Sequence, residues 1–359
     1  MNKIDKLDFV RGVAIIMVFG VHYLSALYPG YQVTEYNSFI LSDKYTLKNI
    51  IMTLNPFGSG DLGVQLFLVI SGFLIHLGYL KGGFQASKFF SKRFWRIYPP
   101  YFISLIFFLF LSGWDFEWYD ILSHVGLFHN LNDSTFFSID AAYWSLALEM
   151  QLYLIYPIFL YLHRKIGLNK ASLSVVGLTV VAIIASIIFN FDSLAYNTSV
   201  LVYWIVWVAG AYIAENFHYN RRLWLVNPLV YVLLLIPLFL LRLTVIYLYI
   251  GPILFSFYFM LVLDWFLATD FHIPQWIFKP ITLIGLCSYS IYLYHYPYLT
   301  GIILFFSPYG RNNYSLLFGG AIAFLFIFAV SWLIYKWIEL PSIKLGTKVY
   351  DLINKKKSL

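Results

Sequence analysis

Two ionisable side chains stand out in an apolar run near the start of the chain. The segment RGVAIIMVFGVH places Arg11 and His22 eleven residues apart. In an α-helix, eleven steps of about 100° return to within about 20° of the starting direction, so both side chains lie on one face. At about 1.5 Å per residue, His22 lies about 20 Å from the start of the run at residue 9, whereas Arg11 lies near that start. A phosphate-bearing ligand held at Arg11 would therefore reach inward toward a histidine that can accept a proton.

Three further polar side chains fall at a similar depth in other apolar runs. Glu149, in AAYWSLALEMQLYLIYP, lies about 10 Å below the outer edge of its run, and His295, in SYSIYLYHYP, about 21 Å from the inner end of its own. Ser71, in LFLVISGFLI, lies closer to the midplane, about 14 Å below the outer edge. We expect His22, Glu149 and His295 to share one layer.

Each of these residues also has a purely structural explanation. A membrane histidine is often a hydrogen-bonding group between helices, which is the alternative for His295, and Ser71 beside Gly72 is typical of close helix packing. A carboxylate inside a membrane faces water, a partner or the interior of the helix bundle. A functional role is therefore favoured for Glu149, and more strongly for His22 and Glu149 together.

A second group of charges lies at the mouth of the third apolar run. The segment SKRFWRIYPPY places Arg93 and Arg96 one turn apart, with Lys92 beside them. Guanidinium groups bind phosphate through two parallel hydrogen bonds. The alternative is that these charges only anchor the helix at the cytoplasmic face. Because Arg11 is expected at that same face, the three arginines together predict a binding site for a phosphate-bearing ligand.

Other polar residues carry less weight. Asp264 is also embedded in apolar sequence, but no motif surrounds it, so we interpret it as a structural or proton-linked residue. The remaining histidines of interest lie near the ends of apolar runs or in connecting segments and need no special role: His76, His124, His129 and His272. The single cysteine, Cys287, lies within an apolar run, so we predict no intrachain disulfide and no Cys-based metal site. No other metal ligands are predicted.

The composition identifies the solvent around these residues as a lipid bilayer. Of 359 residues, 61% are hydrophobic and 11% are charged, against about 25% charged residues in soluble domains. Ten apolar runs are long enough to cross a hydrocarbon core of about 30 Å, and each should be helical because unpaired backbone amides are costly in lipid. We predict an all-α polytopic membrane protein with about ten transmembrane helices. The predicted spans are 9–28, 62–80, 97–113, 142–162, 171–190, 199–217, 224–241, 245–268, 281–306 and 315–338.

The distribution of charge predicts the orientation of the chain in the membrane. With the N-terminus placed inside, the cytoplasmic segments hold 20 of the 24 Lys and Arg residues. This asymmetry predicts that both termini are cytoplasmic. The net charge of +7 is thus explained mostly by topology, with anionic lipid or an anionic cytosolic ligand as secondary explanations, and it does not indicate a nucleic-acid partner. The first run is interpreted as a retained helix, because it is long for a secretory signal and no small-residue cleavage site follows it.

No linker or internal repeat divides the sequence. We expect one transmembrane domain over residues 1–345 and a basic cytoplasmic tail over 346–359. The longest outer segments are 29–61 and 114–141, and the second includes EWYDILSHVGLF, which predicts a short helix at the membrane interface.

These segments together resemble the acyltransferase-3 family of integral-membrane O-acyltransferases. The spacing of Arg11 and His22 is similar to its Arg-x10-His signature, and LFLVISGFLI to its Ser-Gly-Phe motif in the second helix. SKRFWRIYPPY resembles the arginine-rich start of its third helix, and YWSLALEMQLY its Trp-Ser-Leu-x-x-Glu-x-x-x-Tyr stretch. SYSIYLYHYP and WIELP resemble its last two helices. The matches occur in order along nearly the whole chain.

The resemblance implies an enzyme that transfers an acyl group, commonly acetyl, from a cytosolic coenzyme A thioester. The acceptor would be a hydroxyl of a cell-surface polysaccharide or of a lipid-linked sugar, and the enzyme would lie in the bacterial cytoplasmic membrane. Acetyl-CoA or another acyl-CoA is then a substrate, and no tightly bound cofactor is expected. The implied catalytic residues are His22 and Glu149, and the implied donor-binding residues are Arg11, Arg93 and Arg96. The expected supporting residues are Ser71, Trp144, Ser145, Tyr153 and His295.

Several alternatives stay open. His22 is either a general base for the attacking hydroxyl or the carrier of an acyl-histidine intermediate. Either Glu149 or His295 orients it or binds the acceptor. Some relatives carry an extracytoplasmic SGNH hydrolase-like domain. This sequence ends at Leu359 without one, so a separate extracytoplasmic acyl-transfer partner is considered. The competing class is a glycolipid or polysaccharide transporter or flippase, although the paired Gly/Pro-broken helices typical of transporters are not evident.

Overall fold

The computed structural model describes residues 3–27, 55, 58–191, 193–223, 227–244, 246–270, 272–306 and 313–355. Over these ranges the chain forms helices, turns and loops, without a strand. Eight of the described helices are long and apolar enough to cross a membrane, and a bent helix pair raises the number to nine. The prediction of an all-α polytopic membrane protein is confirmed. Most of the predicted outer segment 29–61 lies outside the described residues.

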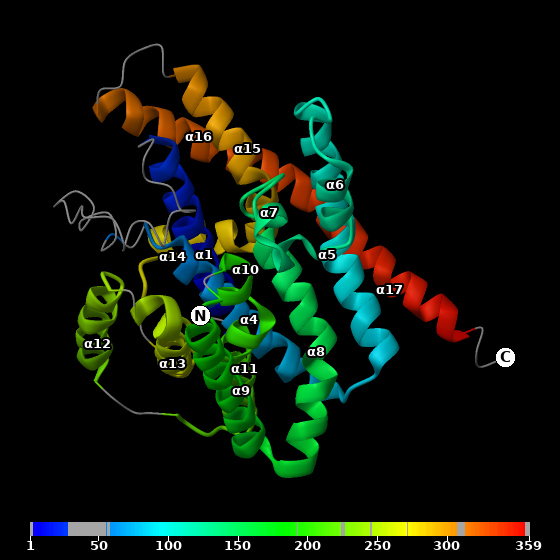
Figure 1. Cartoon of the computed structure of the whole chain (residues 1–359), viewed down its shortest axis with the longest axis vertical. Helices are drawn as coiled ribbons and strands as arrows, with labels where there is room; N and C mark the ends of the chain where they lie inside the picture. Colours follow the sequence, from blue (N-terminus) through cyan, green and yellow to red (C-terminus); the bar gives the residue numbers. More distant parts are fainter. Residues whose placement is uncertain are drawn as a thin grey trace. The chain divides into compact units, whose positions relative to one another are not determined.

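The helices fall into two compact units. The first unit comprises Met1–Gly82 and Leu154–Leu286, and the second comprises Gly83–Tyr153 and Cys287–Leu359. The helix α8 (Trp144–Ile166) contributes residues to both units. Figure 1 labels the helices along the chain.

The first unit is built around α4 (Gly60–Gly82) and α11 (Val200–His218), which pack closely against each other. Besides the end of α8, its other helices are α1 (Lys3–Leu27), α9 (Leu168–Phe189), α10 (Leu194–Asn197), α12 (Pro228–Leu241), α13 (Ile246–Ala268) and α14 (Gln275–Leu286). The helix α4 packs against α1 and α11, α1 also packs against α14, and α11 also packs against α9 and α13. At the α4–α11 contact, a Cβ on Gly72 would lie 2.0 Å from the carbonyl oxygen of Trp207. Gly72 therefore allows the close backbone approach that its position beside Ser71 predicts.

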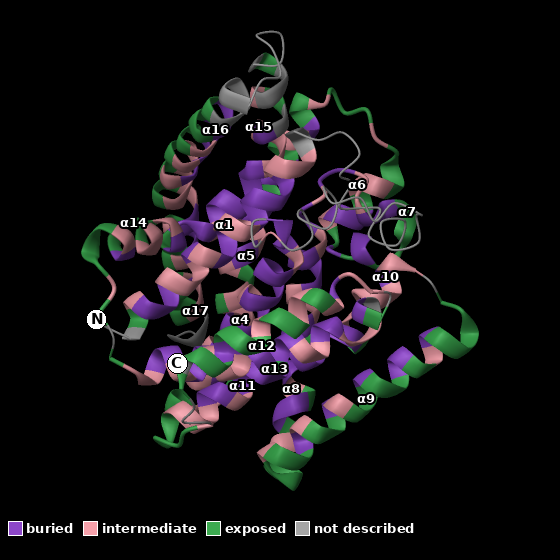
Figure 2. Ribbon diagram, turned by 90° about the vertical axis from the view of Figure 1, so that its left-hand side faces the viewer, coloured by how far each residue is buried: buried purple, intermediate pink, exposed green. Residues whose placement is uncertain are grey.

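Burial within the first unit separates a central helix from one that faces outward. The helix α11 is buried along most of its length, whereas α9 alternates buried and exposed residues (Figure 2). The exposed residues of α9 include Leu173, Val181 and Ile188. Large apolar side chains on an outer helix face are what a bilayer accommodates, so α9 has the composition of a lipid-facing helix.

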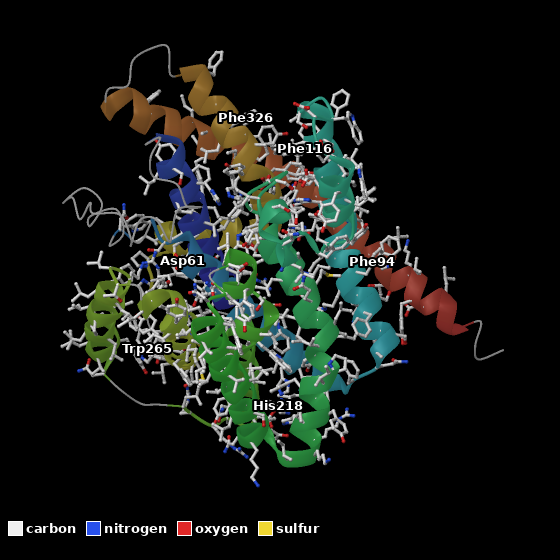
Figure 3. All side chains as sticks on the ribbon, viewed as in Figure 1. Asp61, Phe94, Phe116, His218, Trp265 and Phe326 are labelled. Atoms are coloured by element: carbon white, nitrogen blue, oxygen red, sulfur yellow. The ribbon has the colours of Figure 1, made fainter. Side chains whose placement is uncertain are left out.

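A buried ion pair joins two helices of the first unit at the predicted outer end. Arg242, which follows α12, donates from Nη1 to Asp61 Oδ2 (2.9 Å) and from Nη2 to Asp61 Oδ1 (3.0 Å). Tyr247 also donates its hydroxyl to Asp61, which lies in the first turn of α4 (Figure 3). The two parallel bonds pair the buried guanidinium of Arg242 with the partly exposed carboxylate of Asp61, which lowers the cost of burying the arginine.

The second unit contains the predicted outer segment and the last helices of the chain. Its elements, besides the start of α8, are α5 (Ala86–Leu111), α6 (Trp118–Val125), η3 (His129–Leu131), α7 (Asp133–Phe136), α15 (Ser288–Phe306), α16 (Asn313–Ile334), η5 (Tyr335–Glu339) and α17 (Leu340–Lys355). The helix α5 packs against α15 and α17, and α15 packs against α16. The helix α6 confirms the short helix predicted within EWYDILSHVGLF.

Pro297 in this unit leaves a backbone carbonyl that a side chain from another helix satisfies. Pro297 in α15 has no N–H for the carbonyl of Leu293, one turn earlier, and Ser104 of α5 donates to that carbonyl at 3.1 Å. Ser104 also bonds the hydroxyl of Tyr143 at 2.6 Å. A proline kink is thereby stabilised by a neighbouring helix, as is usual inside membranes.

Three predicted spans differ in detail from the observed helices. The predicted span 281–306 is interrupted at Cys287, which separates α14 from α15. The predicted span 224–241 is the shorter helix α12, because Asn227 caps the backbone N–H of Leu229 and Pro228 opens the first turn. The last span continues through the π-helical turn η5 into α17, which runs through residue 345, the expected domain boundary.

Candidate active site

The first unit carries three of the residues selected from the sequence. Arg11 and His22 lie on the single continuous helix α1, and Ser71 lies half-buried on α4. Arg11 Nη1 donates to Asp8 Oδ1 at 2.7 Å, one turn earlier. The side chain of His22 is 8% exposed. Asp8 thus orients the guanidinium of Arg11, a contact that sequence reasoning missed although the i,i+3 spacing was visible.

The second unit brings three of the selected residues together. Arg93 of α5 lies over the ring of Tyr153 of α8, with its Cζ 5.8 Å from the ring centre. Tyr153 in turn donates its hydroxyl to Glu149, one turn earlier on α8. The Nε atom of Arg93 is buried and has no hydrogen-bond partner among the described residues. A cation, a tyrosine and a carboxylate therefore form one connected group, which we call the Arg93–Tyr153–Glu149 group.

Arg96 makes no hydrogen bond or ion pair with that group. It is half-buried on α5, and within the described part of the chain it makes no hydrogen bond or ion pair. It is thus a half-buried guanidinium one turn beyond Arg93, whose donors are available to an anion.

The backbone around the two arginines is held by other helices. Pro99 has no N–H for the carbonyl of Trp95, and Ser342 of α17 donates its hydroxyl to that carbonyl. Tyr289 of α15 donates to the carbonyl of Ile97 at 2.7 Å. The turn that carries Arg93 and Arg96 is thereby fixed from two sides.

A second polar group in this unit joins the start of α8 to α15. Ser145 Oγ and the hydroxyl of Tyr292 lie 2.6 Å apart, and Tyr292 also donates to the carbonyl of Ala142. His295 Nδ1 lies 2.8 Å from the carbonyl of Tyr292. Because a carbonyl only accepts, Nδ1 carries the hydrogen and Nε2 carries the lone pair. The predicted residues Ser145 and His295 are thus linked through Tyr292, which the sequence did not single out.

Trp144, which precedes Ser145, and Glu339 of the WIELP segment each have a structural partner. Trp144 stacks on Phe136 with ring centres 5.6 Å apart, so it packs against the outer segment. Glu339, in the WIELP segment, is buried and accepts from Ser290 at 2.7 Å. That carboxylate therefore has a structural partner on α15.

The outer segment holds three buried titratable groups that sequence reasoning left without a role or did not single out. His124 and His129 stack with ring centres 3.9 Å apart. Burial lowers the pKa of His124 to about 4 and, with the neighbouring His124, the pKa of His129 to about 3. Asp140 Oδ1 accepts from the N–H of Ala142 at 2.7 Å, and burial raises the pKa of Asp140 to about 7. At neutral pH the two imidazoles are neutral and Asp140 lies near its midpoint.

Comparison with known proteins places these residues within one family. The acyltransferase-3 family model, described as an acyltransferase domain, matches residues 4–336. A putative acetyltransferase, ORF330, of Acidianus two-tailed virus is 30% identical over 272 residues, which cover 68% of this chain and 75% of the viral protein. No solved structure matches the chain.

Two bacterial relatives have longer chains. The peptidoglycan O-acetyltransferase OatA of Listeria monocytogenes is 26% identical over 306 residues, covering 67% of this chain and 45% of the Listeria protein. The O-acetyltransferase OatA of Staphylococcus aureus is 36% identical over 80 residues, covering 22% of this chain and 13% of the Staphylococcus protein. The match over nearly the whole chain and the similarity to the viral relative show that this integral membrane protein belongs to the acyltransferase-3 family.

Proposed function

We propose that the protein is a membrane O-acetyltransferase that moves an acetyl group from cytosolic acetyl-CoA to a hydroxyl of a cell-surface polysaccharide or a lipid-linked sugar. The observation that carries this proposal is the family match over residues 4–336, within which the Arg93–Tyr153–Glu149 group lies. The names of the relatives, which include acetyltransferase and peptidoglycan O-acetyltransferase, support acetyl transfer and a glycan acceptor.

The arginines are proposed to hold the donor at the cytoplasmic face. Coenzyme A carries phosphates, and guanidinium groups bind phosphate oxygens through charge-assisted hydrogen bonds. Arg93 offers a buried Nε that bonds no described residue, and Arg96 lies one turn further along α5. Arg11, oriented by Asp8, is the third proposed contact.

The proposed chemistry is the attack of the acceptor hydroxyl on the thioester carbonyl. His22 takes the hydroxyl proton as the new C–O bond forms, the C–S bond breaks, and the coenzyme A thiolate leaves and takes up a proton. In the alternative route, His22 first carries the acetyl group itself and then passes it to the hydroxyl. In both routes Glu149 binds the acceptor or orients the reacting groups, and Tyr153 fixes its carboxylate.

The acceptor is proposed to receive the acetyl group either directly or through a partner. The chain covers 45% of the Listeria relative. The proposed alternative to direct transfer is that a separate extracytoplasmic partner passes the acetyl group to the final glycan. We propose the bacterial cytoplasmic membrane as the site of action. The transporter or flippase alternative is not favoured, because the matched relatives are named as acetyltransferases.

A reconstituted assay separates the two functional classes. Purified protein in proteoliposomes is given acetyl-labelled acetyl-CoA together with cell-envelope glycolipid, and acetylation and glycolipid translocation are measured in parallel. Transfer of label to the glycolipid in the proteoliposomes, and none in empty liposomes, supports the proposal. Translocation of the glycolipid without any acetyl transfer would overturn it in favour of a flippase.

A further inference from the structure

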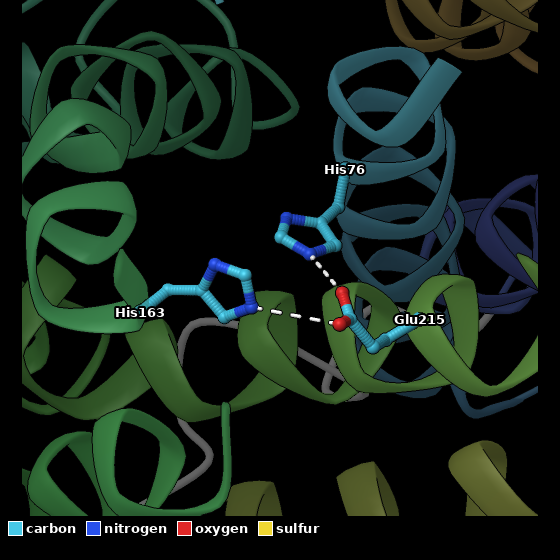
Figure 4. A group of neighbouring side chains, drawn as sticks. All are labelled: His76, His163 and Glu215. Carbon is cyan, nitrogen blue, oxygen red and sulfur yellow. Dashed lines mark hydrogen bonds and ion pairs between the residues drawn. The ribbon is translucent and has the colours of Figure 1, made fainter. Parts of the chain in front are cut away.

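The first unit contains a cluster of ionisable side chains that the proposed reaction does not use. His76 of α4, His163 of α8 and Glu215 of α11 point toward one another (Figure 4). His76 Nε2 lies 3.1 Å from Glu215 Oε2, and His163 Nε2 lies 3.6 Å from Glu215 Oε1. One nitrogen or oxygen atom from each residue lies within 4.8 Å of the others. Three helices thus converge on one point with two imidazoles and one carboxylate.

The spacing of these atoms is close to that of ligands around a small metal ion. Zinc binds histidine nitrogen and carboxylate oxygen at about 2.0–2.2 Å in a tetrahedral arrangement, which places neighbouring ligand atoms about 3.3 Å apart. The distances of 3.1 and 3.6 Å lie on either side of that value. The 3.6 Å separation is within ion-pair range but long for a hydrogen bond, so the direct contact of His163 with Glu215 is a weak one.

The surroundings of His76 fit a metal-ligating histidine. Its Nδ1 lies 3.2 Å from the hydroxyl of Tyr156, and its side chain is fully buried. A metal-bound histidine usually donates its second ring N–H to a neighbouring acceptor, which fixes the tautomer. Without an ion, His76 Nε2–H donates to the Glu215 carboxylate, which only accepts, and His76 Nδ1 accepts from the hydroxyl of Tyr156. A bound ion would replace the Nε2 proton, and Nδ1–H would then donate to the Tyr156 oxygen.

The cluster is accessible to an ion from one side. The side chains of His163 and Glu215 are 15% and 13% exposed, whereas that of His76 is 0% exposed. All three residues lie toward the ends of their helices, near Lys81 and Arg164, which the charge asymmetry assigns to the cytoplasm. In three-ligand zinc sites water is the fourth ligand, and the partly exposed His163 and Glu215 mark the side from which it would bind.

We propose that His76, His163 and Glu215 form a three-ligand site for a divalent transition-metal ion of the zinc type. Imidazole and carboxylate ligands suit this class of ion, and the single carboxylate offsets part of its charge. The ion links α4, α8 and α11 within the first unit. This site contrasts with the expectation of no metal, which rested on the single cysteine and did not consider histidine and glutamate from separate helices.

Metal binding by the full-length protein in detergent tests the proposal. After treatment with EDTA and desalting, the protein is titrated with Zn²⁺, bound metal is measured by elemental analysis, and Co²⁺ is used to record the visible spectrum. Because His76 is fully buried and its replacement risks misfolding, the variants are His163→Ala and Glu215→Gln. His218→Ala, an exposed histidine at the end of α11 (Figure 3), is the matched control.

We expect about one Zn²⁺ per chain in the wild type and in His218→Ala, with a tetrahedral Co²⁺ spectrum. Both ligand variants should bind Zn²⁺ at least about tenfold more weakly, and Tyr156→Phe should bind it about 10- to 100-fold more weakly, because Tyr156 positions His76. Equal Zn²⁺ binding in the wild type, His163→Ala and Glu215→Gln would overturn the proposal, as would no binding to folded wild-type protein. The readout is metal content, so the result does not depend on whether the protein transfers acetyl groups.

Discussion

Tyr153 donates its hydroxyl to the carboxylate of Glu149, one turn earlier on α8, while its ring lies under the guanidinium of Arg93. One side chain therefore connects the proposed donor-binding arginine to the proposed catalytic carboxylate. The connection is built from a local i,i+4 contact on α8 and one contact with α5.

Replacing Tyr153 by Phe keeps the ring under Arg93 and removes only the hydroxyl. A hydrogen bond to a charged group contributes about 1.5–3 kcal/mol, so we expect kcat for acetyl transfer to fall by about 10- to 100-fold. The KM for acetyl-CoA should change little, because the cation–π contact is retained. Steady-state kinetics in proteoliposomes measure both constants, and an unchanged kcat would show that the Tyr153 hydroxyl does not position Glu149.

Arg93→Ala tests the proposed donor contact. Loss of one charge-assisted bond to a phosphate should raise the KM for acetyl-CoA by about 10- to 100-fold. The effect should shrink at high ionic strength, where the wild type also binds the donor more weakly. Lys344→Ala removes an exposed positive charge from α17 and serves as the control. If both variants raise KM equally, general positive charge and not Arg93 binds the donor.

The carbonyls left by the prolines predict a stability effect. Ser342→Ala leaves the carbonyl of Trp95 without its hydroxyl donor, and Ser104→Ala does the same to Leu293. An unsatisfied buried carbonyl costs about 1–3 kcal/mol, so each variant should lower the Tm in detergent. Ser174→Ala, on the exposed face of α9, is the control and should stay within about 0.5 kcal/mol of the wild type. A Tm equal to that of the control would contradict the assigned bonds.

The outer segment should have its own pH dependence. The pKa of His124 is lowered to about 4 and that of His129 to about 3, so their contribution to stability is complete above pH 6.5 and is lost as the pH falls. The pKa of Asp140 is raised to about 7, so its contribution is complete below pH 3.8 and is lost as the pH rises through 7. Between pH 6.5 and 4, the two histidines make the stability of the segment fall as the pH falls, whereas the one aspartic acid makes it rise. The segment should therefore lose at most about 1.4 kcal/mol per pH unit as the pH falls.

Amide hydrogen exchange over α6 and η3, corrected for the intrinsic effect of pH, measures this loss. In His129→Phe the opposite effects of His124 and Asp140 on stability nearly cancel. The stability of the segment should therefore hardly change between pH 6.5 and 4. His272→Ala, an exposed histidine outside the segment, should keep the wild-type slope. A slope that His129→Phe leaves unchanged would show that other groups control the segment.

The sequence predicts those parts of the fold that depend on neighbours along the chain. Apolar runs predict most spans, and the motif around Trp144 predicts that Glu149 and Tyr153 lie one turn apart. The break at Cys287 escapes prediction because the residues on both sides of it are apolar. A hydropathy pattern reports the solvent of a segment and not the continuity of its helix.

Contacts between helices are the part that the sequence does not predict. Ser342 donates its hydroxyl to the carbonyl of Trp95, 247 positions earlier in the chain, and neither segment contains a pattern that identifies the other as its partner. Depth along each span is a partial signal: His76, His163 and Glu215 all lie toward the predicted cytoplasmic ends of their helices. Their similar depth at the cytoplasmic end is visible in the sequence. That they lie side by side in the membrane follows only from the packing of α4 against α11.

Acetyl transfer by His22→Ala tests the central claim most directly. Removing a general base or an acyl carrier should lower kcat by about 10²- to 10⁴-fold. Binding of acetyl-CoA should be retained, because His22 is not a proposed donor contact. His272→Ala is the matched control and should transfer acetyl groups at the wild-type rate. Transfer of labelled acetyl groups by His22→Ala at the rate of the control would contradict the account.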